Sequence, residues 1–233
     1  EALENLGTIA HSGTVRFIEA MQARQAAGQE TDLDLIGQFG VGFYSALIVA
    51  DRIDVHSLSA SPDEAAVKWS STGDGTFSVG PSDRETRGTR IDLHIKDDAK
   101  EFLERFRVES IVRRYSNYVM HPITFQAAGE DGNPTGEPEQ VNEASAFWAR
   151  RASDLEDEDY EAFYKHVMGG FVLPTDKPLA RLHVSLDAPI QFHAVLLVPG
   201  RAPADLFMED RRSLQLYAKR ILVMEDCDTL LPT

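Results

Sequence analysis

The chain has 233 residues, of which 42% are apolar and 26% are charged, so it is long enough for two domains and too apolar to be disordered. Its formal net charge of −15 argues against DNA or another phosphate backbone as a partner, because such partners require a basic face. No apolar stretch reaches the ~18–20 residues of a membrane span, and the single cysteine, Cys227, fits a reducing, cytoplasmic compartment.

A glycine-rich turn that leads into an apolar run is the most informative local pattern. Residues 37–43 read Gly-Gln-Phe-Gly-Val-Gly-Phe, and the apolar run 43–50 predicts a buried helix. Glycines let backbone N–H groups approach a ligand closely, and the first N–H groups of a helix favour an anion. The spacing matches neither a Walker loop nor Gly-x-Gly-x-x-Gly. It indicates a phosphate-binding turn, with a turn for close strand–helix packing as the alternative.

Alternating residues after this turn predict an antiparallel sheet. Strands are expected at 52–57, 66–70, 76–79 and 88–96, with Gly73-Asp74-Gly75 as a hairpin turn between the second and the third. Apolar residues then recur at helical spacing over 99–119, which predicts one helix that Pro122 ends. The following stretch, rich in Gly, Pro and Glu, predicts an interdomain linker.

A second set of elements follows this linker. Ser153 and Glu156 predict a capping box, and the acidic run 154–159 suits the first turns of the helix. Paired strands are expected at 182–186 and 192–198, with a further strand-like segment at 214–224, all in a mixed sheet with helices on it. The histidines of this region lack a short ligand spacing, so no metal site is predicted.

Several sequence blocks carry a resemblance to a known family. Residues 4–14, 37–43 and 87–98 are similar, in order and approximate spacing, to the nucleotide-binding domain of the 90-kDa heat-shock protein family of chaperones. That family belongs to the GHKL superfamily of gyrase, histidine-kinase and mismatch-repair ATPases. Further blocks resemble the opening of the family's middle domain, and they lie at 147–151, 160–166, 199–207 and 216–226.

The resemblance implies a fold class and a domain division. The fold class is α/β (α+β): a partial Bergerat-type α/β sandwich with an antiparallel/mixed sheet, followed by the start of a second α/β middle domain. Residues 1–126 are expected to form the later part of the nucleotide-binding domain with its lid, 127–145 the linker, and 146–233 the beginning of the client-binding middle domain.

The resemblance also implies a nucleotide site for ATP/ADP with Mg²⁺. Asn5 matches a residue that contacts the sugar and phosphate region, Thr89 matches the hydroxyl in the water network of the adenine, and Ser12 and Gly13 fall at the hinge of the lid. His11 stands where the family usually has lysine. The phosphate-binding turn is made up of Gly37, Gln38, Phe39, Gly40, Val41, Gly42 and Phe43.

Catalytic residues are not expected within this chain. In the family, the glutamate that activates water, the asparagine that helps to hold magnesium and the aspartate that reads adenine precede the point that matches Glu1. The arginine that reaches the terminal phosphate follows the point that matches Thr233. The chain is therefore expected to be a fragment that does not hydrolyse ATP by itself.

The function that the resemblance implies is that of an ATP-dependent molecular chaperone. Such a protein binds and remodels client proteins through an ATP-driven clamp of a homodimer in the cytoplasm, with no nucleic acid and no membrane as partner. One alternative is another GHKL ATPase of the mismatch-repair or topoisomerase type, against which the acidic charge and the blocks 199–207 and 216–226 argue. The other is a non-catalytic protein-binding module.

Overall fold

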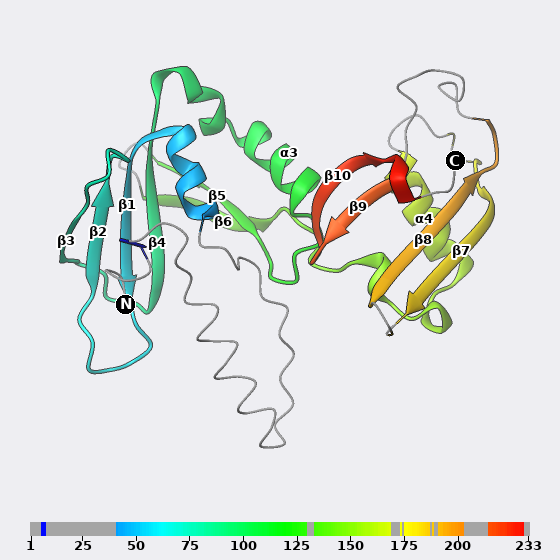
Figure 1. Ribbon diagram of the computed structural model, residues 1–233, viewed down its shortest axis with the longest axis horizontal. Helices are drawn as coiled ribbons and strands as arrows, with labels where there is room; N and C mark the ends of the chain where they lie inside the picture. Colours follow the sequence, from blue (N-terminus) through cyan, green and yellow to red (C-terminus); the bar gives the residue numbers. More distant parts are fainter. Residues whose placement is uncertain are drawn as a thin grey trace. The chain divides into compact units, whose positions relative to one another are not determined.

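The chain forms two compact units, Glu1–Val108 (unit 1) and Glu109–Thr233 (unit 2). The computed structural model describes residues 6–7, 41–129, 133–168, 173, 175–186, 188, 191–202 and 214–230. The predicted site residues Asn5, Ser12, Gly13 and 37–40 lie outside this set. So do all but the first of residues 7–37, the segment in which the family likeness places the lid. Helices and antiparallel sheets occur in both units (Figure 1), which confirms the α/β fold class.

Unit 1 is built on a four-stranded antiparallel sheet with the strand order β3–β2–β1–β4. The turn between β2 and β3 holds Gly73 and Gly75 at φ values of 78° and 89°, which glycine adopts without a steric cost. The predicted strands and hairpin are confirmed. The strands are β1 (Ala50–Leu58), β2 (Val67–Ser71), β3 (Ser78–Pro81) and β4 (Gly88–Ile95).

The register of this sheet separates an apolar face from a polar one. Val55 lies opposite Trp69 on one side and Ile91 on the other, and opposite residues of an antiparallel pair share a face. We call this side the inner face. It comprises Ile53, Val55, Ser57, Val67, Trp69, Ser71, Val79, Pro81, Thr89, Ile91 and Leu93. The outer face comprises Arg52, Asp54, His56, Lys68, Ser70, Arg90, Asp92 and His94.

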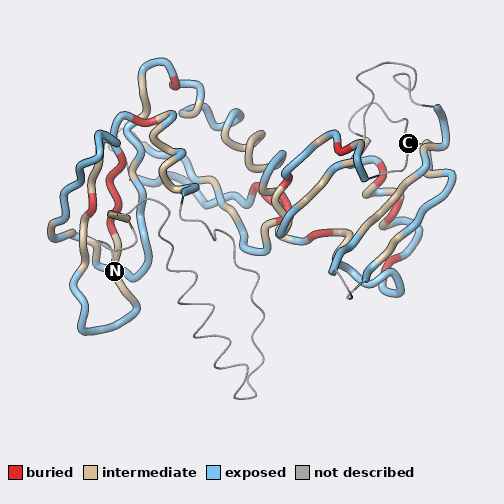
Figure 2. Tube along the Cα trace, in the orientation of Figure 1, coloured by how far each residue is buried: buried red, intermediate tan, exposed pale blue. Residues whose placement is uncertain are grey.

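A short 3₁₀ helix, η1 (Gly42–Ile48), packs on the β1–β2 part of the inner face. Its residues Phe43, Ala46 and Leu47 pack against a core of Ala50, Ile53, Val55 and Trp69. Figure 2 shows the buried positions of this sheet on those two strands. The prediction of a buried helix over 43–50 is wrong, since η1 contains no fully buried residue and Ile48 is 74% exposed. Only one side of the helix faces the sheet.

Lys96 fastens the end of η1. Its Nζ donates to the carbonyl oxygens of Leu47 (2.8 Å) and Ile48 (3.1 Å). Its backbone N–H donates to the carbonyl oxygen of Val49 (3.0 Å). The last carbonyls of a helix have no donor within the helix, and a positive charge beside them is stabilising. We expect Lys96→Met to lower the free energy of unfolding of unit 1 by about 1–2 kcal/mol in urea denaturation.

The matched control for this prediction is Lys100→Met. Lys100 forms only an exposed ion pair with Asp97, at 2.7 Å, so its removal should change the stability little. Equal losses in the two variants would contradict the role of Lys96.

The predicted helix over 99–119 is two helices. The 3₁₀ helix η2 (Asp97–Leu103) ends at Glu104, whose backbone is extended (φ −78°, ψ 123°), and α3 (Arg105–Tyr115) begins directly after it. The prediction of one continuous helix is wrong because neither glycine nor proline marks this break, while the apolar spacing continues across it.

A β-hairpin occupies the predicted linker. Strands β5 (Thr124–Ala128) and β6 (Pro134–Gln140) pair in antiparallel fashion. All residues of β6 are exposed, so its pairing rests on backbone hydrogen bonds and leaves no apolar pattern in the sequence. The segment is therefore not irregular, and its role as an interdomain linker stays a prediction. The domain bounds 1–126, 127–145 and 146–233 remain predictions.

Helix α4 (Asp157–Met168) begins with the predicted acidic turn, but its cap differs from the prediction. The Ser153 hydroxyl bonds to the neighbouring Asp154 carboxylate instead of a helix N–H group. The carboxylate of Asp159 accepts the backbone N–H of Glu156 at 3.0 Å, which satisfies one of the free donors at the start of the helix. Across the described residues, no helix combines the length and the apolar character that crossing a bilayer requires.

The described strands of unit 2 form separate antiparallel hairpins, so the predicted mixed sheet is wrong for this part of the chain. The predicted strand over 214–224 is itself a hairpin, because Lys219 and Arg220 adopt positive φ values of 48° and 67° at its centre. No glycine or asparagine signals that turn. The remaining elements are β7 (Pro178–Leu186), β8 (Phe192–Pro199), β9 (Leu214–Ala218), β10 (Ile221–Cys227), η3 (Phe147–Ala149), η4 (Ala152–Asp154) and η6 (Asp228–Leu230).

Candidate functional site

The end of the glycine turn lies against the core of unit 1. Val41 precedes η1, and Gly42 begins it. The ring of Phe43 lies 5.7 Å from that of Trp69 in an edge-to-face arrangement. A Cβ atom added to Gly42 would meet no heavy atom within 4 Å, so the backbone here is open to an approaching group. Phe43 therefore lies against the inner face, and the backbone of Gly42 beside it is accessible.

Leu6 connects the start of the chain to this turn. The Tyr44 hydroxyl donates to the Leu6 carbonyl oxygen at 2.7 Å, and the Leu6 side chain packs against the core cluster. Asn5 precedes Leu6 directly in the sequence but lies outside the described residues, and so do Ser12, Gly13, Gly37, Gln38, Phe39 and Gly40. The structure thus brings Val41, Gly42 and Phe43 together and leaves the roles of the others as predictions.

Thr89 lies on the same face of the sheet as Phe43. It stands opposite Ser57 in the β1–β4 register, and the two hydroxyl oxygens are 3.0 Å apart. Whereas η1 covers the inner face over β1 and β2, the strip on β4 is open, with Ile91 49% and Leu93 40% exposed. Ser57 was not among the predicted site residues. Strand alternation places it on the inner face, but only the register reveals its contact with Thr89.

The open strip suits the binding of a flat ring rather than acid–base chemistry. Ile91 and Leu93 offer apolar contact, and the hydroxyl pair offers hydrogen bonds at one end of the strip. The inner-face residues defined above include no carboxylate, histidine or lysine that could act as a general base. The described part of this face can therefore hold a ligand but supplies no group to activate water.

Asp54 organises the outer face of the sheet, where no site was predicted. It is 4% exposed. The Ser70 hydroxyl donates to its Oδ1 at 2.5 Å, while Lys68 Nζ (3.3 Å) and His94 Nε2 (3.1 Å) approach its Oδ2. Burial by itself raises the pKa of Asp54, but the hydrogen bonds from Ser70, His94 and Lys68, together with the Lys68 charge, outweigh it and lower the pKa to about 2.

The lowered pKa of Asp54 predicts that the free energy of unfolding falls in acid. Because the pKa of Asp54 in the folded state, about 2, lies below the ~3.9 of an unfolded aspartate, its ionised form stabilises the fold above about pH 4. That stabilisation, up to about 2 kcal/mol, is lost as the pH falls from about 4 toward 2. Urea unfolding between these pH values should show this slope.

Asp54→Asn should flatten the acid slope, since asparagine does not titrate. Asp51→Asn, which changes an exposed carboxylate on the same strand, is the control and should keep the slope. If the free energy of unfolding of Asp54→Asn fell with pH as steeply as that of the wild type, the acid loss would not come from Asp54.

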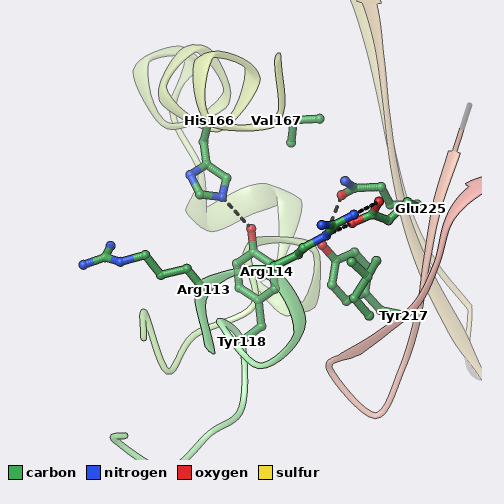
Figure 3. A pocket seen from close by; sticks show the side chains of 9 residues that line it. Arg113, Arg114, Tyr118, His166, Val167, Tyr217 and Glu225 are labelled. Carbon is green, nitrogen blue, oxygen red and sulfur yellow. Dashed lines mark hydrogen bonds and ion pairs between the residues drawn. The ribbon is translucent and has the colours of Figure 1, made fainter. Parts of the chain in front are cut away.

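A pocket in unit 2 is lined mostly by polar residues, several of which form hydrogen bonds or ion pairs with one another (Figure 3). The Tyr118 hydroxyl lies 3.0 Å from His166 Nε2, and the guanidinium of Arg114 pairs through two hydrogen bonds with the Glu225 carboxylate. Hydrogen bonding to Arg114 lowers the pKa of Glu225, and burial raises the pKa of Tyr118 and of Tyr217. These contacts tie α3, α4 and the β9–β10 hairpin together within unit 2.

The fold and the site define a class of protein: an α/β protein with a glycine turn and an open, ligand-accommodating sheet face. Comparison with known proteins gives the family. The model of the Hsp90 protein family matches residues 132–233. The chaperone protein HtpG of Myxococcus xanthus is 44% identical over 100% of this chain, which corresponds to 35% of that relative.

Two further relatives give the same result. The HtpG proteins of Geobacter sulfurreducens and Rhodospirillum rubrum are 42% and 43% identical over the whole chain, which spans 37% and 36% of their lengths. The chain belongs to the Hsp90 family. It spans little more than a third of the length of these curated relatives.

Proposed function

We propose that the whole protein is an ATP-dependent molecular chaperone of the Hsp90 type. The observation that carries this proposal is the identity above 40%, over the entire chain, to proteins named as HtpG chaperones. Clients are non-native or maturing proteins, and the working form is a cytoplasmic homodimer that closes as a clamp when ATP binds. Neither a nucleic acid nor a membrane is a partner in this proposal.

The proposed nucleotide site lies on the inner face of unit 1. The exposed Thr89 hydroxyl and the apolar strip on β4 would hold the base, and the open backbone of Val41, Gly42 and Phe43 would face the phosphates. Thr89 and the glycine turn share one face of the sheet, which supports this arrangement. The remaining contacts assigned by family likeness are Asn5, Ser12, Gly13, Gly37, Gln38, Phe39 and Gly40.

The described inner face does not itself fit a magnesium site. Magnesium prefers carboxylate, carbonyl and water oxygens in an octahedral arrangement, and the inner-face residues include no carboxylate. The ligands of magnesium would be the phosphates of ATP and residues outside this face.

An ATPase and aggregation assay tests the proposal. The full-length protein should hydrolyse ATP with magnesium and suppress the aggregation of a heat-unfolded test protein in an ATP-dependent manner. The 233-residue chain alone should show no turnover above background, because its described inner face has no general base. Suppression of aggregation by a full-length protein that neither binds nor hydrolyses ATP would instead identify a non-catalytic binding module.

A further inference from the structure

A pair of hydroxyl groups stands at one end of the open strip on the inner face. Ser57 and Thr89 are directly opposite each other on β1 and β4, so the strand pairing itself holds their oxygen atoms 3.0 Å apart. Ser57 is half-buried, whereas Thr89 is exposed on β4, which is an edge strand among the described strands of the sheet. The half-buried Ser57 hydroxyl is thus a hydrogen-bond partner for the exposed Thr89 hydroxyl.

We propose that Ser57 is a positioning residue for nucleotide binding, which acts by holding the Thr89 hydroxyl toward the base. This inference rests on the nucleotide site proposed above. In the site, the base would lie on Ile91 and Leu93 with one edge toward Thr89, and Ser57 would remain behind Thr89 without touching the ligand.

The physical basis of this role is preorganisation. A threonine side chain on an exposed edge strand can occupy more than one staggered rotamer, and its hydroxyl hydrogen rotates freely. Binding a ligand through such a group costs conformational entropy, which a fixed partner removes in advance. The hydrogen bond between the Ser57 and Thr89 hydroxyls restricts the rotamer of Thr89. With Ser57 as the donor, the hydroxyl hydrogen of Thr89 is left for the ligand, and with Thr89 as the donor its oxygen lone pairs are left.

The Ser57–Thr89 pair and the glycine turn lie at different ends of β1, so changes in them should affect different parts of the bound nucleotide. Ser57 lies near the end of β1, whereas η1 joins the beginning of that strand at Ala50. A change at Ser57 should therefore weaken the binding of the base and leave the phosphate contacts unaffected. Adenosine and ADP should lose affinity by the same factor.

Titration calorimetry on the full-length protein tests this role with ADP and adenosine as probes. Ser57→Ala should weaken both ligands about two- to tenfold, the range expected for one hydrogen bond. Ser57→Thr keeps a hydroxyl group and should restore most of the affinity. Ser78→Ala removes an exposed hydroxyl from β3 of the same sheet and is the matched control with no expected effect.

A double-mutant cycle shows whether Ser57 acts through Thr89. In a Thr89→Val background, Ser57→Ala should cause no further loss of ADP affinity. An equal loss with and without Thr89, or a larger loss for ADP than for adenosine, would overturn the inference. A thermal unfolding midpoint within about 2 °C of the wild type would show that Ser57→Ala is folded. If the wild type binds neither ligand, the proposed function itself fails, which is a distinct result.

Discussion

Replacing Trp69 with alanine is expected to unfold most of unit 1. Trp69 is 2% exposed, and its ring contacts Phe43 at 5.7 Å and stacks on Phe77 at 6.0 Å, so it joins η1 to the sheet. Removing a buried tryptophan side chain costs about 3–5 kcal/mol, which is a large share of the stability of a small unit. Urea denaturation followed by circular dichroism should show the loss, and nucleotide binding should be lost with it.

Trp69→Phe is the matched control for this prediction. The Nε1 group of Trp69 is buried and has no hydrogen-bond partner in the described part of the chain, and such an unsatisfied donor costs about 1–3 kcal/mol. Phenylalanine keeps most of the apolar ring and removes that donor, so it should retain most of the stability. If phenylalanine proved as damaging as alanine, packing around this ring would not be what holds unit 1 together.

Tyr118→Ala should have the corresponding effect on unit 2. Tyr118 is 4% exposed, and its ring centre lies 4.5 Å from that of Trp148 and 5.5 Å from that of Tyr217. These contacts join the segment after α3 to η3 and to β9. The expected loss is about 3–5 kcal/mol, by analogy with other buried aromatic residues. Trp148 belongs to unit 2 and Trp69 to unit 1, so tryptophan fluorescence in a Trp69→Phe background reports the loss in unit 2 during urea unfolding.

The comparison with Tyr118→Phe separates packing from hydrogen bonding. Phenylalanine keeps the ring contacts and removes the hydroxyl group with its hydrogen bond to His166, which should cost about 0.5–1.5 kcal/mol. A wild-type midpoint for Tyr118→Ala would contradict the role of the aromatic cluster in unit 2.

The fold of unit 1 was predictable because its strands alternate and its turn contains the expected glycines. Polar and apolar residues alternate along β1 from Arg52 to Ser57, and the structure places them on opposite faces. The misses have different physical causes. The helix break at Glu104 and the turn at Lys219 and Arg220 depend on backbone angles. The sequence has no glycine, asparagine or proline at these positions from which the break or the turn could be predicted. The β5–β6 hairpin buries almost nothing, so it has no hydrophobic signature.

The candidate site was predictable only through family likeness. The glycine turn alone indicated an anion site, and nothing in the pattern around Thr89 marks it as a ligand contact. The structure adds that Thr89 and Phe43 share the inner face and that the Ser57 hydroxyl lies opposite that of Thr89 on the neighbouring strand. Ser57 escaped prediction because a serine in an alternating strand is uninformative until the register of the neighbouring strand is known.

Hydrogen exchange of the full-length protein with and without ADP and magnesium tests most directly whether the inner face of unit 1 binds the nucleotide. We expect ADP to slow backbone exchange at residues 41–48 and along β4, from Gly88 to Ile95, with little change at the exposed strand β6. Tight ADP binding without protection of either segment would place the nucleotide elsewhere, and an absence of ADP binding would contradict the proposed function.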